Sequence, residues 1–215
     1  MTSPELVVFD LDGVLIDSRE ANVEAFSYGI ESLGLPRPRP EEVERLIGRT
    51  AGEMLVQLGC PSRDVGRVYD RAVLPRYLEC LVDLARPMPG ASELLDLLTR
   101  AGIPVAACTS GGLALQESVL RSLGLRQAFA DIQSPCRSAL KKPDPGFLGE
   151  LVARFPGSPR RVVHVEDLEE GCLMGRRWGA VAVFAEYGYG CWTSPEEPDH
   201  RIHCLADLVP ILFPG

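Results

Sequence analysis

Short apolar runs alternate with amphipathic stretches along most of this 215-residue chain. Residues 6–9, 103–108, 162–165 and 180–184 are almost continuously apolar, as strands buried on both faces of a parallel sheet are. Helical periodicity follows these runs or lies between them, at 91–100, 113–123, 145–154 and 170–178. Strands that alternate with helices in this way predict an α/β fold with a doubly wound parallel sheet.

The stretch from residue 17 to residue 86 breaks this rhythm. It contains helical patterns alone, at 17–33, 40–46, 51–58 and 62–84. Proline-rich segments at 36–40 and 87–90 punctuate it, because proline disfavours helix at its own position and at the one before. We therefore predict a discontinuous core domain of residues 1–16 and 87–215, with an all-helical domain of residues 17–86 inserted after the first strand.

Composition narrows the range of partners and compartments. A formal net charge of −8 argues against nucleic acid or an anionic membrane as a partner, so an anionic substrate has to be bound by a local positive site. Lys141 and Lys142 are the two lysines among 22 basic residues, so any step that needs a lysine uses one of them. Seven cysteines without CxxC spacing, and no signal-peptide or membrane-length apolar pattern, predict a soluble, cytoplasmic protein with reduced thiols.

Polar segments follow the apolar runs where the strands are predicted to end. Asp-Leu-Asp-Gly stands at 10–13, Thr-Ser-Gly-Gly at 109–112 and Glu-Asp at 166–167. Ligands of open α/β sheets bind beyond the carboxyl ends of the strands, so we expect these groups to converge, joined by the loop that carries Lys142. Taken singly, each has an ordinary alternative as an acidic turn, a helix cap or a solvated lysine. Together they supply the nucleophile, metal ligands, hydroxyl and cation that phosphoryl transfer needs.

In this order the segments resemble the four motifs of the haloacid dehalogenase superfamily. Val-Phe-Asp-Leu-Asp-Gly at 8–13 resembles the first motif, Ala-Ala-Cys-Thr at 106–109 the second, Lys-Pro-Asp-Pro at 142–145 the third and Val-Glu-Asp at 165–167 the fourth. The resemblance covers essentially the whole chain and fits the helical-cap (C1) branch, with its phosphoglycolate phosphatases and β-phosphoglucomutase-like hydrolases. It implies a Rossmann-like core and a helical cap that closes over the active site.

The resemblance also implies a reaction, the Mg²⁺-dependent hydrolysis of a small phosphomonoester of the phosphoglycolate or sugar-phosphate type. Asp10 would attack the phosphorus and form an aspartyl-phosphate. Asp12 would protonate the leaving alcohol and then deprotonate the water that releases phosphate. Thr109 and Lys142 would hold the phosphoryl oxygens.

The metal site implied by the same resemblance uses the first and fourth motifs. Mg²⁺ would lie between the Asp10 carboxylate, the backbone carbonyl of Asp12 and Asp167. Glu166 would be a direct or water-mediated ligand.

Four further residues are candidates for substrate contact. Ser110 and Gly111 follow the second motif, where backbone N–H groups and hydroxyls at the start of a helix form an anion site. Arg49 lies between two predicted helices, where relatives place a loop that reaches into the site. The alternative for Arg49 is a solvated loop arginine. Asn22 occupies the position at which β-phosphoglucomutases carry a histidine.

Departures from related motifs favour hydrolysis. Carbon–halogen cleavers lack an acid at the position of Asp12, and phosphonatases need a cap lysine, which residues 17–86 do not contain. Asn22 argues against β-phosphoglucomutase chemistry without excluding a phosphomutase. Leu168 stands where the usual residue is serine, which keeps open a catalytically idle member that only binds a phosphorylated ligand. For the phosphatase, the phosphomutase and the idle member alike, we expect a monomer or a homodimer with a small-molecule phosphate ester as its ligand.

Overall fold

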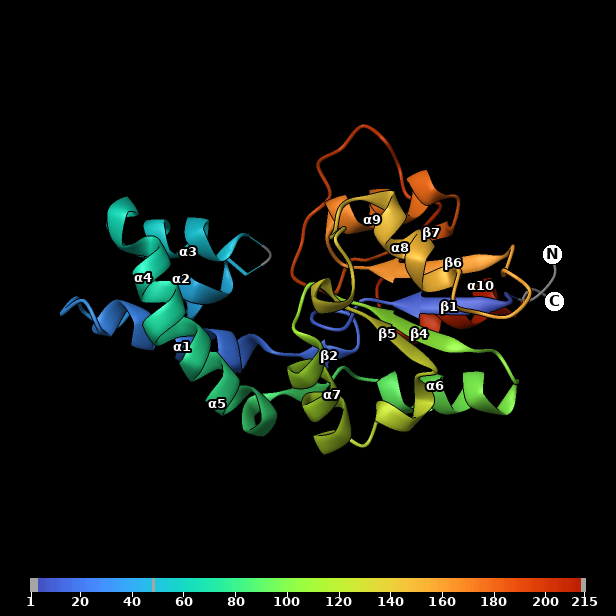
Figure 1. Cartoon of the computed structure of the whole chain (residues 1–215), viewed down its shortest axis with the longest axis horizontal. Coiled ribbons are helices and arrows are strands. Elements are labelled where there is room, and N and C mark those ends of the chain that lie inside the picture. Colours follow the sequence, from blue (N-terminus) through green and yellow to red (C-terminus); the bar gives the residue numbers. More distant parts are fainter. Residues whose placement is uncertain (1–3, 48, 214–215) are drawn as a thin grey trace. The chain divides into compact units, whose positions relative to one another are not determined.

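The computed structural model describes residues 4–47 and 49–213, and its core is a six-stranded parallel sheet. The sheet order is β5-β4-β1-β6-β7-β8, and each neighbouring pair is parallel (Figure 1). The strands are β1 (Leu6–Phe9), β4 (Val105–Cys108), β5 (Asp131–Gln133), β6 (Val162–Glu166), β7 (Val181–Ala185) and β8 (His200–Ile202). The predicted doubly wound parallel sheet is confirmed.

The first strand lies in the middle of the sheet, between two strands that come much later in the chain. Phe9 is in register with Ala107 of β4 on one side and with Val165 of β6 on the other. The strand order therefore reverses at β1, which is the point where open α/β sheets bind their ligands. The loops after β1, β4 and β6 consequently leave the same edge of the sheet.

Helices cover both faces of this sheet. The helices α8 (Pro145–Val152) and α9 (Glu169–Trp178) lie on one side, and α6 (Ala91–Arg100) and α7 (Leu113–Ser122) lie on the other (Figure 1). One core cluster joins Leu6 and Val8 of β1 to Phe147 of α8 and Met174 of α9, all of them fully buried. Burying each such side chain contributes about 1.5–3 kcal/mol, which keeps the ends of β1 and β6 in a fixed register.

Two edge strands were not among the predicted elements. β5 and β8 each contain three residues, and the pattern of β8 places only Ile202 in the interior. Such short, half-polar segments carry too little periodicity to distinguish a strand from a loop. The four predicted strands and the four core helices are present, with ends that differ by a few residues.

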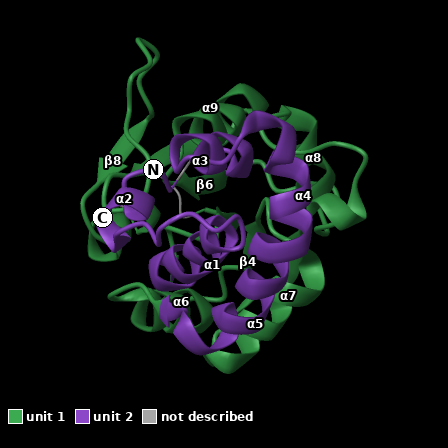
Figure 2. Cartoon of the chain, turned by 90° about the vertical axis from the view of Figure 1, so that its left-hand side faces the viewer, with its two compact units in different colours: residues 1–16, 87–215 green, residues 17–86 purple. Residues whose placement is uncertain are grey.

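The chain divides into two compact units, residues 1–16 with 87–215 and residues 17–86, which Figure 2 colours separately. The second unit contains α1 (Arg19–Glu31), α2 (Pro40–Glu44), α3 (Ala51–Gln57) and a longer helical segment. Short strands β2 (Ile16–Asp17) and β3 (Arg86–Pro87) pair where the chain passes between the units. No helix of the described residues is long and apolar enough to cross a membrane.

The segment predicted as one helix over 62–84 is interrupted. It consists of a 3₁₀ turn at Ser62–Asp64, α4 (Val65–Val68), a π-helical turn at Tyr69–Val73 and α5 (Leu74–Leu84). Pro75 stands in the first turn of α5, and it cannot donate the backbone hydrogen bond that a continuous α-helix needs there. The π turn accommodates the missing hydrogen bond, and the helix continues after it as α5.

Candidate functional site

Asp10 and Lys142 are brought together at the end of the central strand. Asp10 follows β1 directly, is 8% exposed, and its N–H donates to the carbonyl of Val165 at 2.9 Å. The Nζ of Lys142 donates to Asp10 Oδ1 at 2.8 Å and also to Glu166 Oε1. Burial alone would lower the pKa of Lys142, but the carboxylates of Asp10 and Glu166 raise it above its usual value. The ammonium group therefore stays charged beside Asp10.

Three carboxylates form a buried cluster at this edge of the sheet. One side-chain oxygen each from Asp10, Glu166 and Asp167 lies within 4.8 Å of the others. Burial raises the pKa of Glu166 to about 7, against the lowering effect of Lys142. Burial and the charges of Glu166 and Asp10 also raise the pKa of Asp167. Crowded carboxylates of this kind are stabilised in their ionised form by a bound cation.

This cluster fits a hard divalent cation. Asp167 Oδ1 is buried and has no hydrogen-bond partner among the described residues, although a buried carboxylate oxygen normally has one. The donor set consists of carboxylate oxygens, which suit Mg²⁺ and do not suit softer metals. The side chain of Asp12 is outside the cluster, so any metal contact from Asp12 would have to come from its backbone.

Glycines allow the chain to pass close to Asp167. Gly13 has a φ of +84°, and a Cβ there would lie 2.0 Å from Asp167 Oδ2. A Cβ on Gly188 would lie 2.2 Å from the Cβ of Asp167. The backbone N–H of Tyr189 donates to Asp167 Oδ2 at 2.8 Å. Gly188 and Tyr189 were not predicted as site residues from the sequence, although the Tyr-Gly-Tyr-Gly run at 187–190 was a signal that could have identified them.

The carboxylate of Asp12 has a partner that sequence reasoning also missed. Gln116 in α7 donates from Nε2 to Asp12 Oδ2 at 2.7 Å. Gln116 is 2% exposed. No local motif marks this glutamine, because it stands within an ordinary helical pattern and contacts Asp12 only in the folded chain.

The segment after β4 forms a compact turn. Thr109 is buried, its N–H donates to Gln133 O at 3.0 Å, and its Oγ1 accepts from the N–H of Gly111 at 3.0 Å. Ser134 Oγ donates to the carbonyl of Gly111 at 2.7 Å. Ser110 is exposed, and Gly111 is half-buried. The N–H of Gly111 is thus engaged within the turn, and the hydroxyl of Ser110 is accessible to solvent.

Leu168 stands at the start of α9 and provides no side-chain cap. Its backbone N–H donates to Glu166 Oε2 at 3.4 Å. A Cβ on Gly190 would lie 3.0 Å from the Leu168 side chain. Leu168 therefore places a hydrocarbon side chain next to the acidic loop.

Asn22 and Arg49 belong to the helical unit. Asn22 Nδ2 donates to Ser18 O at 3.0 Å and to Ser18 Oγ at 3.4 Å, within α1 and its cap. Arg49 is exposed, and its N–H donates to Leu46 O at 3.1 Å. Contact of either residue with a substrate stays a prediction.

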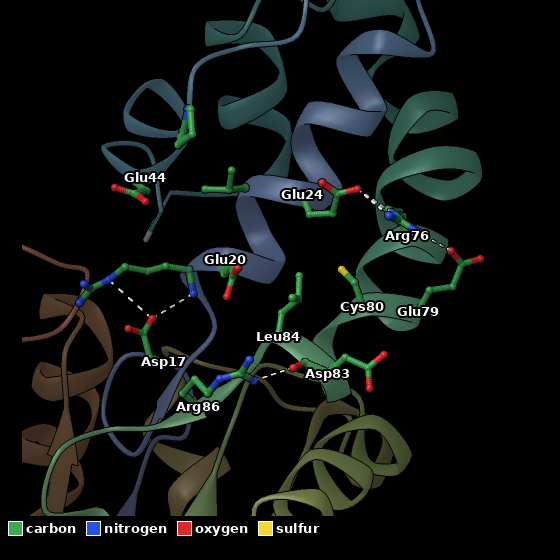
Figure 3. A pocket seen from close by; sticks show the side chains of 13 residues that line it. Asp17, Glu20, Glu24, Glu44, Arg76, Glu79, Cys80, Asp83, Leu84 and Arg86 are labelled. Carbon is green, nitrogen blue, oxygen red and sulfur yellow. Dashed lines mark hydrogen bonds and ion pairs between the residues drawn. The ribbon is translucent and has the colours of Figure 1, made fainter.

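A cavity of about 890 Å³ lies in the helical unit (Figure 3). Its described lining contains three arginines and more carboxylates, among them Asp17, Glu20, Glu44 and Asp83. Arg76 pairs with Glu24 at 2.6 Å inside it. Neither Asn22 nor Arg49 is among its lining residues. The cavity is acidic overall, so by itself it does not attract a phosphate group.

With this geometry in place, comparison with known proteins assigns the family. A family model described as haloacid dehalogenase-like hydrolase matches residues 4–179. The chain belongs to this family of hydrolases, and the predicted resemblance is confirmed. The predicted fold class, a Rossmann-like core with an inserted helical cap domain, is confirmed as well.

Individual relatives narrow the class. A protein of Agrobacterium fabrum named phosphoglycolate phosphatase is 31% identical, over 97% of this chain and 92% of its own length. A protein of Mycobacterium tuberculosis named tyrosine-protein kinase PtkA is 28% identical, over 87% of this chain and 64% of its own length. The solved structure of a predicted phosphoglycolate phosphatase from Haemophilus somnus superposes with a TM-score of 0.87, at 23% identity, over 98% of this chain and 99% of that one. These relatives and the family model confirm the predicted enzyme class, a phosphoric monoester hydrolase.

Proposed function

We propose that this protein is a Mg²⁺-dependent phosphatase that hydrolyses a small-molecule phosphomonoester through an aspartyl-phosphate on Asp10. The observation that carries the proposal is the contact of Lys142 Nζ with Asp10 Oδ1 at 2.8 Å, beside the buried cluster of Asp10, Glu166 and Asp167. A nucleophilic carboxylate, a fixed cation and a set of hard oxygen ligands in one place are the parts that phosphoryl transfer requires.

Asp10 is the proposed nucleophile because of its position and its partner. It follows β1, one of the two central strands, with 8% exposure, and its backbone N–H donates to the carbonyl of Val165. Lys142 orients one carboxylate oxygen and offers positive charge where a phosphoryl oxygen would arrive. Thr109 Oγ1, in the turn after β4, is the proposed hydroxyl contact to the phosphoryl group, with Ser110 and Gly111 beside it.

Asp12 is the proposed general acid and base. Its carboxylate is outside the acidic cluster and accepts a hydrogen bond from Gln116, so its surroundings differ from those of Asp10. Such a difference is what two carboxyl groups two residues apart need in order to take separate roles. Asp12 gives a proton to the leaving alcohol in the first half of the reaction and takes one from water in the second.

Asp10, Asp167 and Glu166 are the residues that would hold Mg²⁺, together with the backbone carbonyl of Asp12. When bound, the ion would offset the negative charge of the carboxylates and of the incoming phosphate. The residues 17–86 are the proposed cap, with Arg49 and Asn22 as its contacts to the substrate. The phosphoglycolate phosphatase named above favours a substrate of the phosphoglycolate type.

Phosphate release from 2-phosphoglycolate and p-nitrophenyl phosphate, with and without Mg²⁺, tests this proposal. Asp10→Asn keeps the size of the side chain and removes the nucleophile, so the rate should fall by about 10³-fold or more. Asp96→Asn, an exposed change on α6, is the matched control and should keep the wild-type rate. Equal rates for wild type and Asp10→Asn would refute the role of Asp10. A sugar phosphate that is isomerised without release of phosphate would favour a phosphomutase.

A further inference from the structure

Gln116 is a buried glutamine whose amide contacts the carboxylate of Asp12. It is 2% exposed, and its Nε2 donates to Asp12 Oδ2 at 2.7 Å. The two residues are 104 positions apart in the chain, and the fold brings α7 next to the loop that follows β1. The amide N–H thus holds one oxygen of the Asp12 carboxyl group in place.

Packing alone does not account for a glutamine at this position. Gln116 Oε1 is buried and has no hydrogen-bond partner among the described residues. A buried amide with an unused oxygen costs more free energy than a leucine or methionine of similar size. What the amide adds is its N–H donor, and a carboxyl oxygen of Asp12 accepts it.

The turn after β4 is shaped to admit this amide. A Cβ on residue 111 would lie 2.4 Å from Gln116 Nε2, so a side chain there would push the amide out of its present position. Ser134 Oγ donates to the carbonyl of Gly111, and the N–H of Gly111 donates to Thr109 Oγ1. The glutamine amide therefore lies between this hydrogen-bonded turn and Asp12.

We propose that Gln116 is a positioning residue for Asp12, whose N–H holds Oδ2 and so fixes the carboxyl group in the orientation that proton transfer needs. This inference rests on the proposed phosphatase reaction. Gln116 touches no reacting atom and acts through Asp12.

The proton balance of the two half-reactions follows from this placement. In the first, a bond forms between Asp10 and phosphorus, the bond between phosphorus and the leaving oxygen breaks, and the Asp12 carboxyl group gives its proton to that oxygen. In the second, the oxygen of water attacks phosphorus, the bond to Asp10 breaks, and the Asp12 carboxylate takes the proton of the water. Asp12 returns to its starting protonation state.

Two esters with different leaving groups separate a positioning role from a structural one. Gln116→Met and Gln116→Leu keep the bulk of the side chain and remove the N–H donor. For an alkyl ester such as 2-phosphoglycolate, whose alkoxide has to be protonated, kcat/KM should fall by about 10- to 100-fold. For p-nitrophenyl phosphate, whose phenolate leaves without protonation, kcat/KM should fall by less than about threefold. For p-nitrophenyl phosphate, kcat and KM should fall together, because the attack of water on the aspartyl-phosphate still depends on Asp12.

Val119→Ala is the matched control for the helix. Val119 is fully buried in α7, so its truncation loosens the same helix without removing the donor to Asp12, and it should affect both esters by the same factor. Asp12→Asn should also lose more kcat/KM on the alkyl ester than on p-nitrophenyl phosphate, and the difference should be larger than in the Gln116 variants. Thermal unfolding of each variant verifies that it is folded.

An equal loss on both esters in Gln116→Met, or full activity on the alkyl ester, would overturn the proposal. Crystal structures of the wild type and Gln116→Met give a readout that needs no turnover, in which an unmoved Asp12 carboxylate would overturn it too. A failure of the proposed function has a different signature, since the wild type would then release phosphate from neither ester. In that case Asp12 transfers no proton, and the role of Gln116 falls with it.

Discussion

Replacing Lys142 by methionine tests how the buried acidic cluster is stabilised. The Lys142 side chain is 11% exposed and pairs with both Asp10 and Glu166, so solvent screens these pairs little. Removing one partner of a buried ion pair leaves an uncompensated charge and costs about 3–5 kcal/mol. We therefore expect metal-free Lys142→Met to lose about this much unfolding free energy at pH ~8. For a chain of this length the melting temperature should fall by about 6–20 °C.

The size of this loss should depend on pH in a defined direction. Burial raises the pKa of Glu166 from 4.5 to about 7, and Lys142 acts against this rise. A carboxyl group with a higher pKa in the folded state binds more protons when folded. Its contribution to stability is present below its unfolded pKa and is lost as the pH rises through its folded pKa. Without Lys142 the folded pKa rises further, so the difference between variant and wild type should be small near pH ~5 and largest near pH ~8.

Urea unfolding in the presence of a chelator measures this difference. Wild type, Lys142→Met and Lys141→Met are compared at both pH values, with the exposed Lys141 as the matched control. Lys141→Met should follow the wild type within about 0.5 kcal/mol, as surface substitutions usually do. Equal stability of Lys142→Met and wild type near pH ~8, or a loss that does not change with pH, would refute the reasoning.

Two further predictions concern Asp167. Gly13→Ala places a Cβ 2.0 Å from Asp167 Oδ2 at a φ of +84°, so urea unfolding should show a loss of about 1–3 kcal/mol together with lower phosphatase activity. Gly102→Ala, at a φ of +68° with no atom within 4 Å of the new Cβ, should lose only about 1 kcal/mol and keep its activity, and equal effects of the two changes would contradict the steric argument. Mg²⁺ at about 100 times its Kd should stabilise the wild type by about 2.7 kcal/mol, measured as a shift in melting temperature. Asp167→Asn should lose most of that shift, and an unchanged shift would place the cation elsewhere.

The central strands and the polar segments that follow them were predictable because their signals are local. A run such as Leu6–Phe9 is apolar at every position, which is enough to predict a strand buried on both faces. Its last residue is followed at once by Asp10, so the position of Asp10 at the carboxyl end of the strand follows from the chain itself. The interrupted helix over 62–84 had a local signal too, in Pro75, although the π turn that precedes it did not.

Contacts between distant segments were decided by the tertiary structure. Lys142 lies 132 positions from Asp10, and the choice of Lys142 over Lys141 rested on a resemblance to a motif until the fold brought its Nζ to the carboxylate. Gln116 contacts Asp12 and the backbone of Tyr189 contacts Asp167. No local motif marks Gln116, and the Tyr-Gly-Tyr-Gly run around Tyr189 does not say which acid it meets. Periodicity reports which side chains are buried and in what local conformation, whereas the partner of a buried polar group depends on which helices and loops pack around it. The sequence by itself thus determined the class of the fold and the identity of the acidic residues, and the packing of α7 and of the 187–190 segment decided how those acids are held.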